Sequence, residues 1–151
     1  MTLFESPEAE WTSRMLSVLR IVVGLLFVQH GAQKLFGFPA WPGPPVQLMS
    51  QLGVAGILET FGGLAIVLGL MTRPIAFLLA GEMAVAYFQF HIRKSFFPVV
   101  NGGEPVVLFC FMFLYLVFAG AGAWSIDAAL AKSRRANRPT PSHDRSYAHP
   151  R

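Results

Sequence analysis

The sequence predicts an all-α integral membrane protein, a bundle of four transmembrane helices. Of the 151 residues, 54% are hydrophobic and only 13% are charged, and the mean hydropathy is +0.50. This composition is too apolar for a soluble domain of the same length. Four apolar runs of about helix length cover residues 15–38, 52–71, 75–92 and 105–124. The runs lack the alternation of strands, and helices are favoured in lipid because they satisfy their own backbone hydrogen bonds.

The first three runs are bounded by short breaking segments. The run at 15–38 ends at the proline-rich segment 39–45, where the chain cannot continue as a regular helix. The runs at 52–71 and 75–92 are separated only by residues 72–74. Because that link is short, we expect the second and third helices to form an antiparallel hairpin.

The fourth run, 105–124, is apolar on every side. It has no charged residue between Glu104 and Asp127, whereas a helix of a soluble bundle has a polar outer face. Beyond it the chain becomes polar, basic and proline-containing, a composition typical of disorder. The expected organisation is a cytoplasmic segment at 1–14, a four-helix transmembrane domain at 15–130 and a disordered basic tail at 131–151.

The distribution of basic residues predicts the orientation and excludes some functions. The cations expected at one face of the membrane are Arg14, Arg73, Lys132, Arg134, Arg135 and Arg138, against Lys34, Arg93 and Lys94 at the other. This excess predicts that both termini are cytoplasmic. The net charge of +4 comes largely from the tail, where it suits anionic lipid better than nucleic acid. The single cysteine, Cys110, excludes a disulfide framework and a cysteine metal cluster, and we expect no metal site.

Ionisable residues inside the apolar runs are the main functional signal. A charged side chain at the centre of a membrane helix costs about 2.5–3.5 kcal/mol on insertion scales, so each one needs a partner. One helical stripe of the first run holds, at successive spacings of 4, 3, 4 and 3, Arg20, Gly24, Phe27, Gly31 and Lys34. Glycines on a stripe allow a second helix to approach closely, so these cations should point into the bundle.

Acidic residues of the second and third runs are the natural partners of these cations. Glu59 shares a face with Gly62 in the second run, and Glu82 lies in the third. The expected ion pairs join Arg20 to Glu82, and Glu59 to Lys34 or His30.

A further polar group is expected at the outer end of the bundle. His91, Asn101 and Glu104 should gather there with Arg93. On an ideal helix His91 points away from Glu82, so it joins the cluster only if the end of that helix rotates or frays. The predicted intramembrane pocket comprises Arg20, His30, Lys34, Glu59, Glu82, His91, Asn101 and Glu104, with close-packing glycines Gly24, Gly31 and Gly62.

Two interpretations of this set stay open. In one, the pairs neutralise each other and fix the register of the helices. In the other, they line a pocket for a small polar, quinone-like or redox-active ligand, or a proton path, because intramembrane ionisable groups are by default functional candidates. No catalytic residue is assigned.

Three motifs, in order, resemble the DoxX family over residues 14–130. The first is RIVVGLLFVQHGAQKLFGF, with Arg20, Gly24, Gly31, Lys34, Leu35, Phe36 and Gly37. The second is LETFGGLAIVLGLMTRPIA, with Glu59, Gly62, Gly63, Leu68, Gly69, Thr72 and Arg73. The third is HIRKSFFPVVNGGEPVVLF, with His91, Phe96, Asn101, Gly102, Gly103 and Glu104.

The resemblance implies a four-helix protein of the bacterial inner membrane. Relatives have been linked to thiosulfate:quinone oxidoreduction, to quinol oxidase subunits, and to oxidative or thiol stress alongside soluble redox enzymes. The chain has no paired cysteines or haem-attachment motif, so a quinone or a partner subunit would carry the electrons. The leading hypothesis is a small-ligand or quinone-binding subunit, at most part of a quinone-linked oxidoreductase. The alternatives are a membrane scaffold that recruits a soluble redox enzyme, and a small exporter or permease acting as a homo-oligomer.

Overall fold

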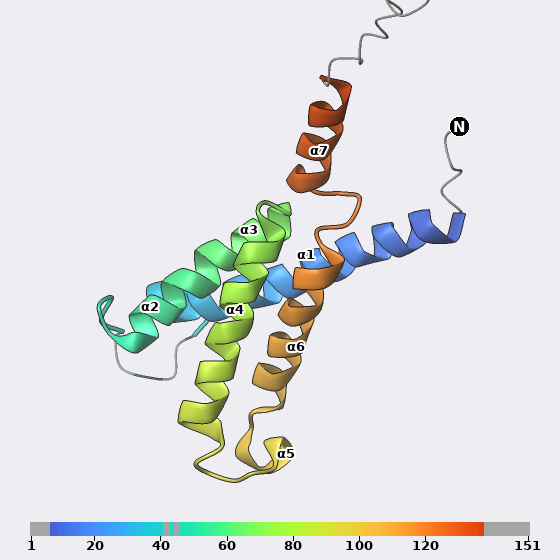
Figure 1. Ribbon diagram of the computed structural model, residues 1–151. Coiled ribbons are helices and arrows are strands. Elements are labelled where there is room, and N and C mark those ends of the chain that lie inside the picture. The colour runs from blue at the N-terminus through green and yellow to red at the C-terminus, as the bar shows by residue number, and fades with distance from the viewer. Residues whose placement is uncertain (1–6, 41–42, 44–45, 138–151) are drawn as a thin grey trace, which may run out of the picture.

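The computed structural model describes residues 7–40, 43 and 46–137, and within these ranges the chain is all helical, with no strand. The elements are α1 (Pro7–Phe36), α2 (Gln51–Ile57), η1 (Leu58–Gly62), α3 (Gly63–Leu68), α4 (Thr72–Ala86), η2 (Tyr87–His91), α5 (Pro98–Asn101), α6 (Glu104–Ala119) and α7 (Ile126–Ala136). The two η elements are single π-helical turns. Because α2, η1 and α3 follow one another without a break, as do α4 and η2, each series forms one continuous helix (Figure 1).

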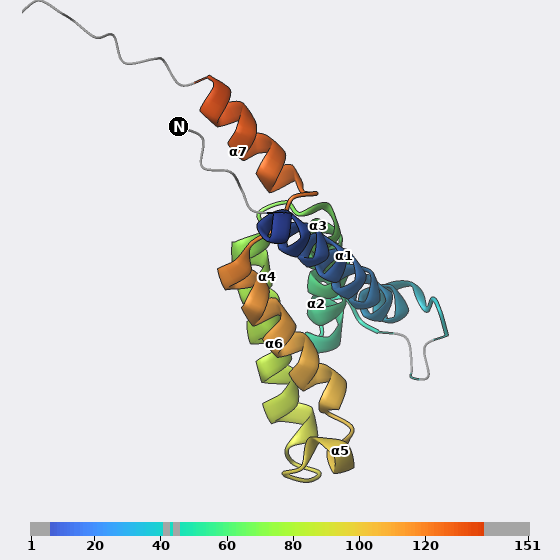
Figure 2. The same cartoon turned by 90° about the vertical axis from the view of Figure 1, so that its right-hand side faces the viewer.

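The long helices associate as two pairs. Helix α1 packs along α2, η1 and α3, while α4 packs along α6. Figures 1 and 2 show that the pairs come together near α3 and diverge toward α2 on one side and α5 on the other. The short link between α3 and α4 makes the expected antiparallel hairpin.

Glycines set the closest approaches between helices. A Cβ atom on Gly24 would lie 3.0 Å from the carbonyl oxygen of Gly63, and one on Gly31 would lie 2.8 Å from that of Gly56. Both contacts join α1 to the second helix. A Cβ atom on Gly62 would lie 2.9 Å from the side chain of Leu79, so this glycine faces α4 instead. Small residues thus allow the backbones of α1 and the second helix to approach closely, and on the other side of that helix they make room for a side chain of α4.

The buried core is small and the apolar surface is large. The rings of Phe27 and Phe113 are fully buried and meet edge to face, with centroids 4.7 Å apart. On the outside, Leu64, Phe111 and Phe118 are 49%, 64% and 75% exposed. Apolar side chains exposed over whole helices indicate a surface that faces lipid.

Two continuous helices, Pro7–Phe36 and Gln51–Leu68, are long and apolar enough to cross a membrane by length and composition. Helix α6, with 16 residues, is shorter than the predicted fourth span. It ends at Ala119 and not at residue 124, because Gly120 and Gly122 adopt left-handed φ values of 84° and 76°, which break the helix. Helix α1 begins eight residues earlier than the predicted start at 15 (Pro7 against Met15). Proline suits a first helical turn, and Glu8 and Glu10 complement the positive end of the helix dipole.

The predicted disordered tail is wrong at its start, because residues 131–136 belong to helix α7. Ser125 caps this helix by accepting a hydrogen bond from the backbone N–H of Ala128 at 3.1 Å, and Arg134 and Arg135 complement its C-terminal dipole. Residues 1–6 of the predicted N-terminal segment and residues 138–151 of the tail lie outside the described residues.

Candidate functional site

A buried ion pair joins the end of α1 to the second helix. The Lys34 ammonium donates a hydrogen bond to a Glu59 carboxylate oxygen, and the two side chains are only 15% and 6% exposed. Gly56 lets the start of the Lys34 side chain lie close to the second helix, since a Cβ atom on Gly56 would lie only 3.1 Å from the Cβ of Lys34. This close approach helps the ammonium to reach Glu59. The structure thus places Lys34, and not His30, on Glu59.

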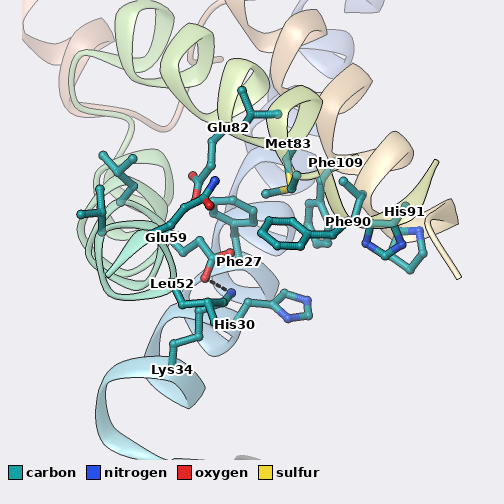
Figure 3. A pocket seen from close by; sticks show the side chains of 18 residues that line it. Phe27, His30, Lys34, Leu52, Glu59, Glu82, Met83, Phe90, His91 and Phe109 are labelled. Atoms are coloured by element: carbon teal, nitrogen blue, oxygen red, sulfur yellow. Dashed lines mark hydrogen bonds and ion pairs between the residues drawn. The ribbon is translucent and has the colours of Figure 1, made fainter. Parts of the chain in front are cut away.

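Glu82 has no comparable partner in the part of the chain that the structure describes. It extends from α4 toward Glu59, close enough for the charges of Glu59 and Lys34 to act on it (Figure 3). Both of its carboxyl oxygens are buried, and neither has a hydrogen-bond partner among the described residues. A buried polar group without a partner typically costs about 1–3 kcal/mol.

The predicted ion pair between Arg20 and Glu82 is wrong. Arg20 is completely buried, but its guanidinium donates to backbone carbonyls: to Ala121 at 2.8 Å, to Trp124 at 2.6 Å, and also to Ile66 and Val67. The last carbonyl groups of a helix have no partner within it and carry the negative end of its dipole. The Arg20 guanidinium therefore binds to the C-terminal end of α3 and not to Glu82, although pairing by charge alone predicts Glu82.

A cavity of about 400 Å³ lies where the two helix pairs diverge. All four long helices contribute to its wall, which is mostly apolar, and three of the rings in it are Phe27, Phe90 and Phe109 (Figure 3). The polar side chains that line it are His30, Lys34, Gln51, Glu59, Glu82 and His91. The Lys34–Glu59 pair and the unpartnered Glu82 therefore face one shared space.

The π-helical turn η2 brings His91 to this cavity. A π-helical turn holds one more residue than an α-helical turn, so it rotates the residues that follow. Both Glu82 and His91 line the cavity as a result, whereas on an ideal α-helix they would point apart. The His91 ring stacks on Tyr87, with centroids 6.2 Å apart, and its Nδ1 lies 3.2 Å from the carbonyl oxygen of Asn101. Glu59 also lies in a π-helical turn, a feature frequent at functional sites.

Asn101 and Glu104 do not line the cavity. The Asn101 amide orders the loop before α6: it donates to the carbonyl of Ser95 at 2.8 Å and accepts from the backbone N–H of Gly103 at 2.7 Å. Glu104 is exposed in the first turn of α6, where a carboxylate complements the helix dipole.

The structure thus brings together five of the eight predicted pocket residues. They are His30, Lys34, Glu59, Glu82 and His91, and those outside the cavity are Arg20, Asn101 and Glu104. Sequence reasoning missed Gln51, which lies just before the predicted second helix and donates to the side chain of Gln89. The sequence feature that could have indicated Gln51 is its position as a polar residue directly before an apolar run.

The described residues contain no group of three or more His, Cys, Asp or Glu side chains that could hold a metal ion. Cys110 lies on α6 and faces α4, where its thiol lies 3.4 Å from the carbonyl oxygen of Ala80.

Comparison with known proteins gives one family and several relatives. The family model DoxX matches residues 15–92. An uncharacterized protein of Haemophilus influenzae is 43% identical over 122 residues, which cover 74% of this chain and 87% of that protein. Inner membrane protein YqjF of Escherichia coli is 35% identical over 130 residues, covering 76% of this chain and 91% of YqjF. An uncharacterized membrane protein of Mycobacterium tuberculosis is 26% identical over 133 residues, covering 76% and 80%. No solved structure matches the chain.

Proposed function

This chain belongs to the DoxX family of integral membrane proteins, and we propose that it is an inner-membrane subunit that binds a quinone-like headgroup in the pocket around Glu82. The observation that carries the proposal is the Glu82 carboxyl, which is buried in a mostly apolar cavity without a partner among the described residues. A ligand that hydrogen-bonds to Glu82 would offset this cost.

The proposed arrangement has four membrane crossings: α1, α2–η1–α3, α4–η2 and α6. Its support is that the α3–α4 link and the end of α6 lie together at one end of the helices, and the α1–α2 and η2–α6 connections lie away from that end (Figure 1). Hydrogen bonds from the α6–α7 link and the first turn of α7 hold the body of α1 and the α3–α4 link at one end. The backbone N–H of Trp124 donates to the Ser17 hydroxyl, and that of Asp127 donates to the carbonyl oxygen of Gly69. The basic residues near this end outnumber those at the other, which favours cytoplasmic termini.

The chemistry of the pocket suits a quinone and its quinol. A quinone presents two carbonyl acceptors, and a quinol presents two hydroxyl donors. A carboxyl group accepts hydrogen bonds and, when protonated, also donates one, so Glu82 can serve either form. The Lys34 ammonium and the His30 and His91 rings add further donors, and Phe27, Phe90 and Phe109 offer aromatic surface to a flat ring. A cavity of about 400 Å³ falls within the usual size range of small-molecule sites.

In this proposal the protein residues bind and orient the ligand. Glu59 holds the Lys34 ammonium at the cavity wall, and the aromatic side chains exclude water from the ring. A bound quinone would supply two-electron redox chemistry, and the electrons would come from a partner protein in respiratory or oxidative-stress chemistry.

The test is to quantify quinone bound to the protein after purification in mild detergent. The wild-type chain should retain quinone that solvent extraction and mass spectrometry detect. Glu82→Met keeps the size of the side chain and removes its hydrogen bonds, so bound quinone should fall about 10- to 100-fold, as expected for a hydrogen bond to an ionisable group. Glu104→Gln, outside the cavity, is the matched control. A wild-type protein without quinone, or a Glu82→Met variant that retains it fully, contradicts the proposal.

A second candidate, a scaffold that recruits a soluble enzyme, is favoured by α7. This helix projects from the body of the protein (Figures 1 and 2), and its residues from Ala129 to Ala136 are all exposed, including Lys132, Arg134 and Arg135. Truncation from Ala131 should then abolish recovery of the partner, and unchanged recovery would contradict a role for this helix.

A further inference from the structure

The cavity has an opening between the start of the second helix and the end of the third. Helix α2 packs against α1, and among the described residues no comparable packing joins α2 to η2, the end of the third long helix. The two sides are connected by a hydrogen bond in which the Gln51 amide donates to the Gln89 carbonyl oxygen. One contact between two exposed side chains is a weak closure compared with the glycine-mediated packing on the α1 side.

Apolar side chains line both edges of this opening. Leu52 and Val54 on one edge, and Val85 and Phe90 on the other, belong to the cavity wall. The same four side chains are between 42% and 49% exposed on the outside of the protein. These four side chains therefore present apolar surface both to the outside of the protein and to the cavity that Glu82 lines.

We infer that the ligand enters sideways from the lipid between α2 and η2, and that it carries a hydrocarbon tail which stays in this opening while the headgroup lies at Glu82. The inference rests on the proposed function and specifies the ligand class: a lipid-dissolved amphiphile with one polar ring and one apolar chain. A freely water-soluble molecule gains nothing from an apolar entrance of this kind.

The polar residues are distributed as such a ligand requires. Lys34, Glu59 and Glu82 lie on the inner wall. Along the opening the side chains are apolar until Gln51 and Gln89, which hydrogen-bond to each other and leave no charge for the tail to pass. The ionisable hydrogen-bonding groups therefore lie inside the cavity, and the opening offers the tail an apolar surface apart from the Gln51–Gln89 pair.

The experiment compares two probes on one protein. The first is the dimethoxy-methyl-benzoquinone headgroup without a tail, and the second is the same headgroup with a decyl tail. Leu52→Trp places a large ring in the opening and leaves the Glu82 carboxyl in place, so it should weaken binding of the decyl compound at least about tenfold, as overpacking does. Binding of the tail-free headgroup should change less than about threefold. Leu64→Trp is the matched control, because Leu64 is 49% exposed on the same continuous helix but does not line the cavity.

Each result decides a different point. Equal loss of both probes in Leu52→Trp, or no loss of the decyl compound, overturns the sideways entry and leaves quinone binding in place. Failure of both probes to bind the wild-type chain overturns the proposed function and the entry route together. Both binding measurements use the full-length chain in one detergent, so the partition of the probes is the same for every variant.

Discussion

Replacing Glu82 by Met should make the ligand-free protein more stable while removing its ligand affinity. The two Glu82 oxygens are buried without a partner among the described residues. Methionine has a similar shape and no polar atoms that need hydrogen bonds. A buried ligand-binding group that has no hydrogen-bond partner in the protein lowers the free energy of unfolding. A group that holds the helices together raises it.

The size of the effect follows from the cost of an unsatisfied polar group. About 1–3 kcal/mol should be recovered in the free energy of unfolding. For a chain of this length each kcal/mol shifts Tm by about 2–4 °C, so the expected rise is roughly 2–12 °C. Thermal unfolding in detergent, followed by circular dichroism on protein stripped of bound lipid-soluble molecules, measures it. The control is Glu104→Gln, an exposed position where Tm should stay within about 2 °C.

Added ligand gives the second half of the measurement. A compound that binds only the folded state raises the free energy of unfolding, by about 2.7 kcal/mol at a concentration of 100 Kd, and therefore raises Tm. Decyl benzoquinone should therefore raise Tm of the wild-type chain and leave that of Glu82→Met unchanged. A Glu82→Met variant that is less stable than wild type refutes the reasoning, because it would show that the carboxyl holds the helices together.

Three other substitutions test the contacts around the site. Glu59→Gln leaves the Lys34 ammonium buried without its carboxylate, so the free energy of unfolding should fall by about 3–5 kcal/mol; a loss below about 1 kcal/mol in a chemical denaturation series would mean that the pair is solvated. Arg20→Lys cannot reach four carbonyl groups, because an ammonium has three donors, and the loss of at least one hydrogen bond from a charged group should cost about 1.5–3 kcal/mol; an unchanged melting curve would contradict the described geometry. Gly31→Ala places a Cβ atom 2.8 Å from the carbonyl oxygen of Gly56, so it should destabilise the protein by about 1–3 kcal/mol. A Cβ atom at the control position, Gly81→Ala, meets nothing within 4 Å, so this variant should be neutral or stabilising by up to about 1 kcal/mol. Equal changes in the free energy of unfolding at the two glycines would argue against close packing on α1.

The sequence predicts the helices and one side of the site because those features depend on local patterns. Apolar runs reveal lipid-facing helices, and a stripe of glycines and cations on α1 indicates the face that meets the second helix. Lys34 and Glu59 follow from that stripe, since the closest helix approach lies next to both. The ends of the helices are harder to predict, because Gly120 ends α6 through its backbone conformation and not through polarity.

Arg20 and His91 show what the sequence alone does not specify. The partners of Arg20 are carbonyl groups at residues 66–67 and at 121 and 124, and backbone carbonyls look the same at every position of a sequence. Only the tertiary fold selects which of them end near one guanidinium. His91 reaches the cavity through the π-helical turn η2, and nothing in the residue types of that turn distinguishes it from ordinary helix.

The hydrogen bonds that Arg20 makes in place of a pair with Glu82 also explain why a cavity exists at Glu82. Arg20 ties α1, the end of α3 and the link after α6 together, and the carboxylate of Asp127 accepts hydrogen bonds from the backbone N–H groups of Met71 and Thr72 at 2.9 Å each. These bonds close one end of the two helix pairs. Because the pairs cross at that end, they must separate toward the other, where the Lys34–Glu59 pair holds only the first two helices together. Had Arg20 paired with Glu82, the carboxyl would be neutralised and would not be free to hydrogen-bond to a ligand at the point where the helices part.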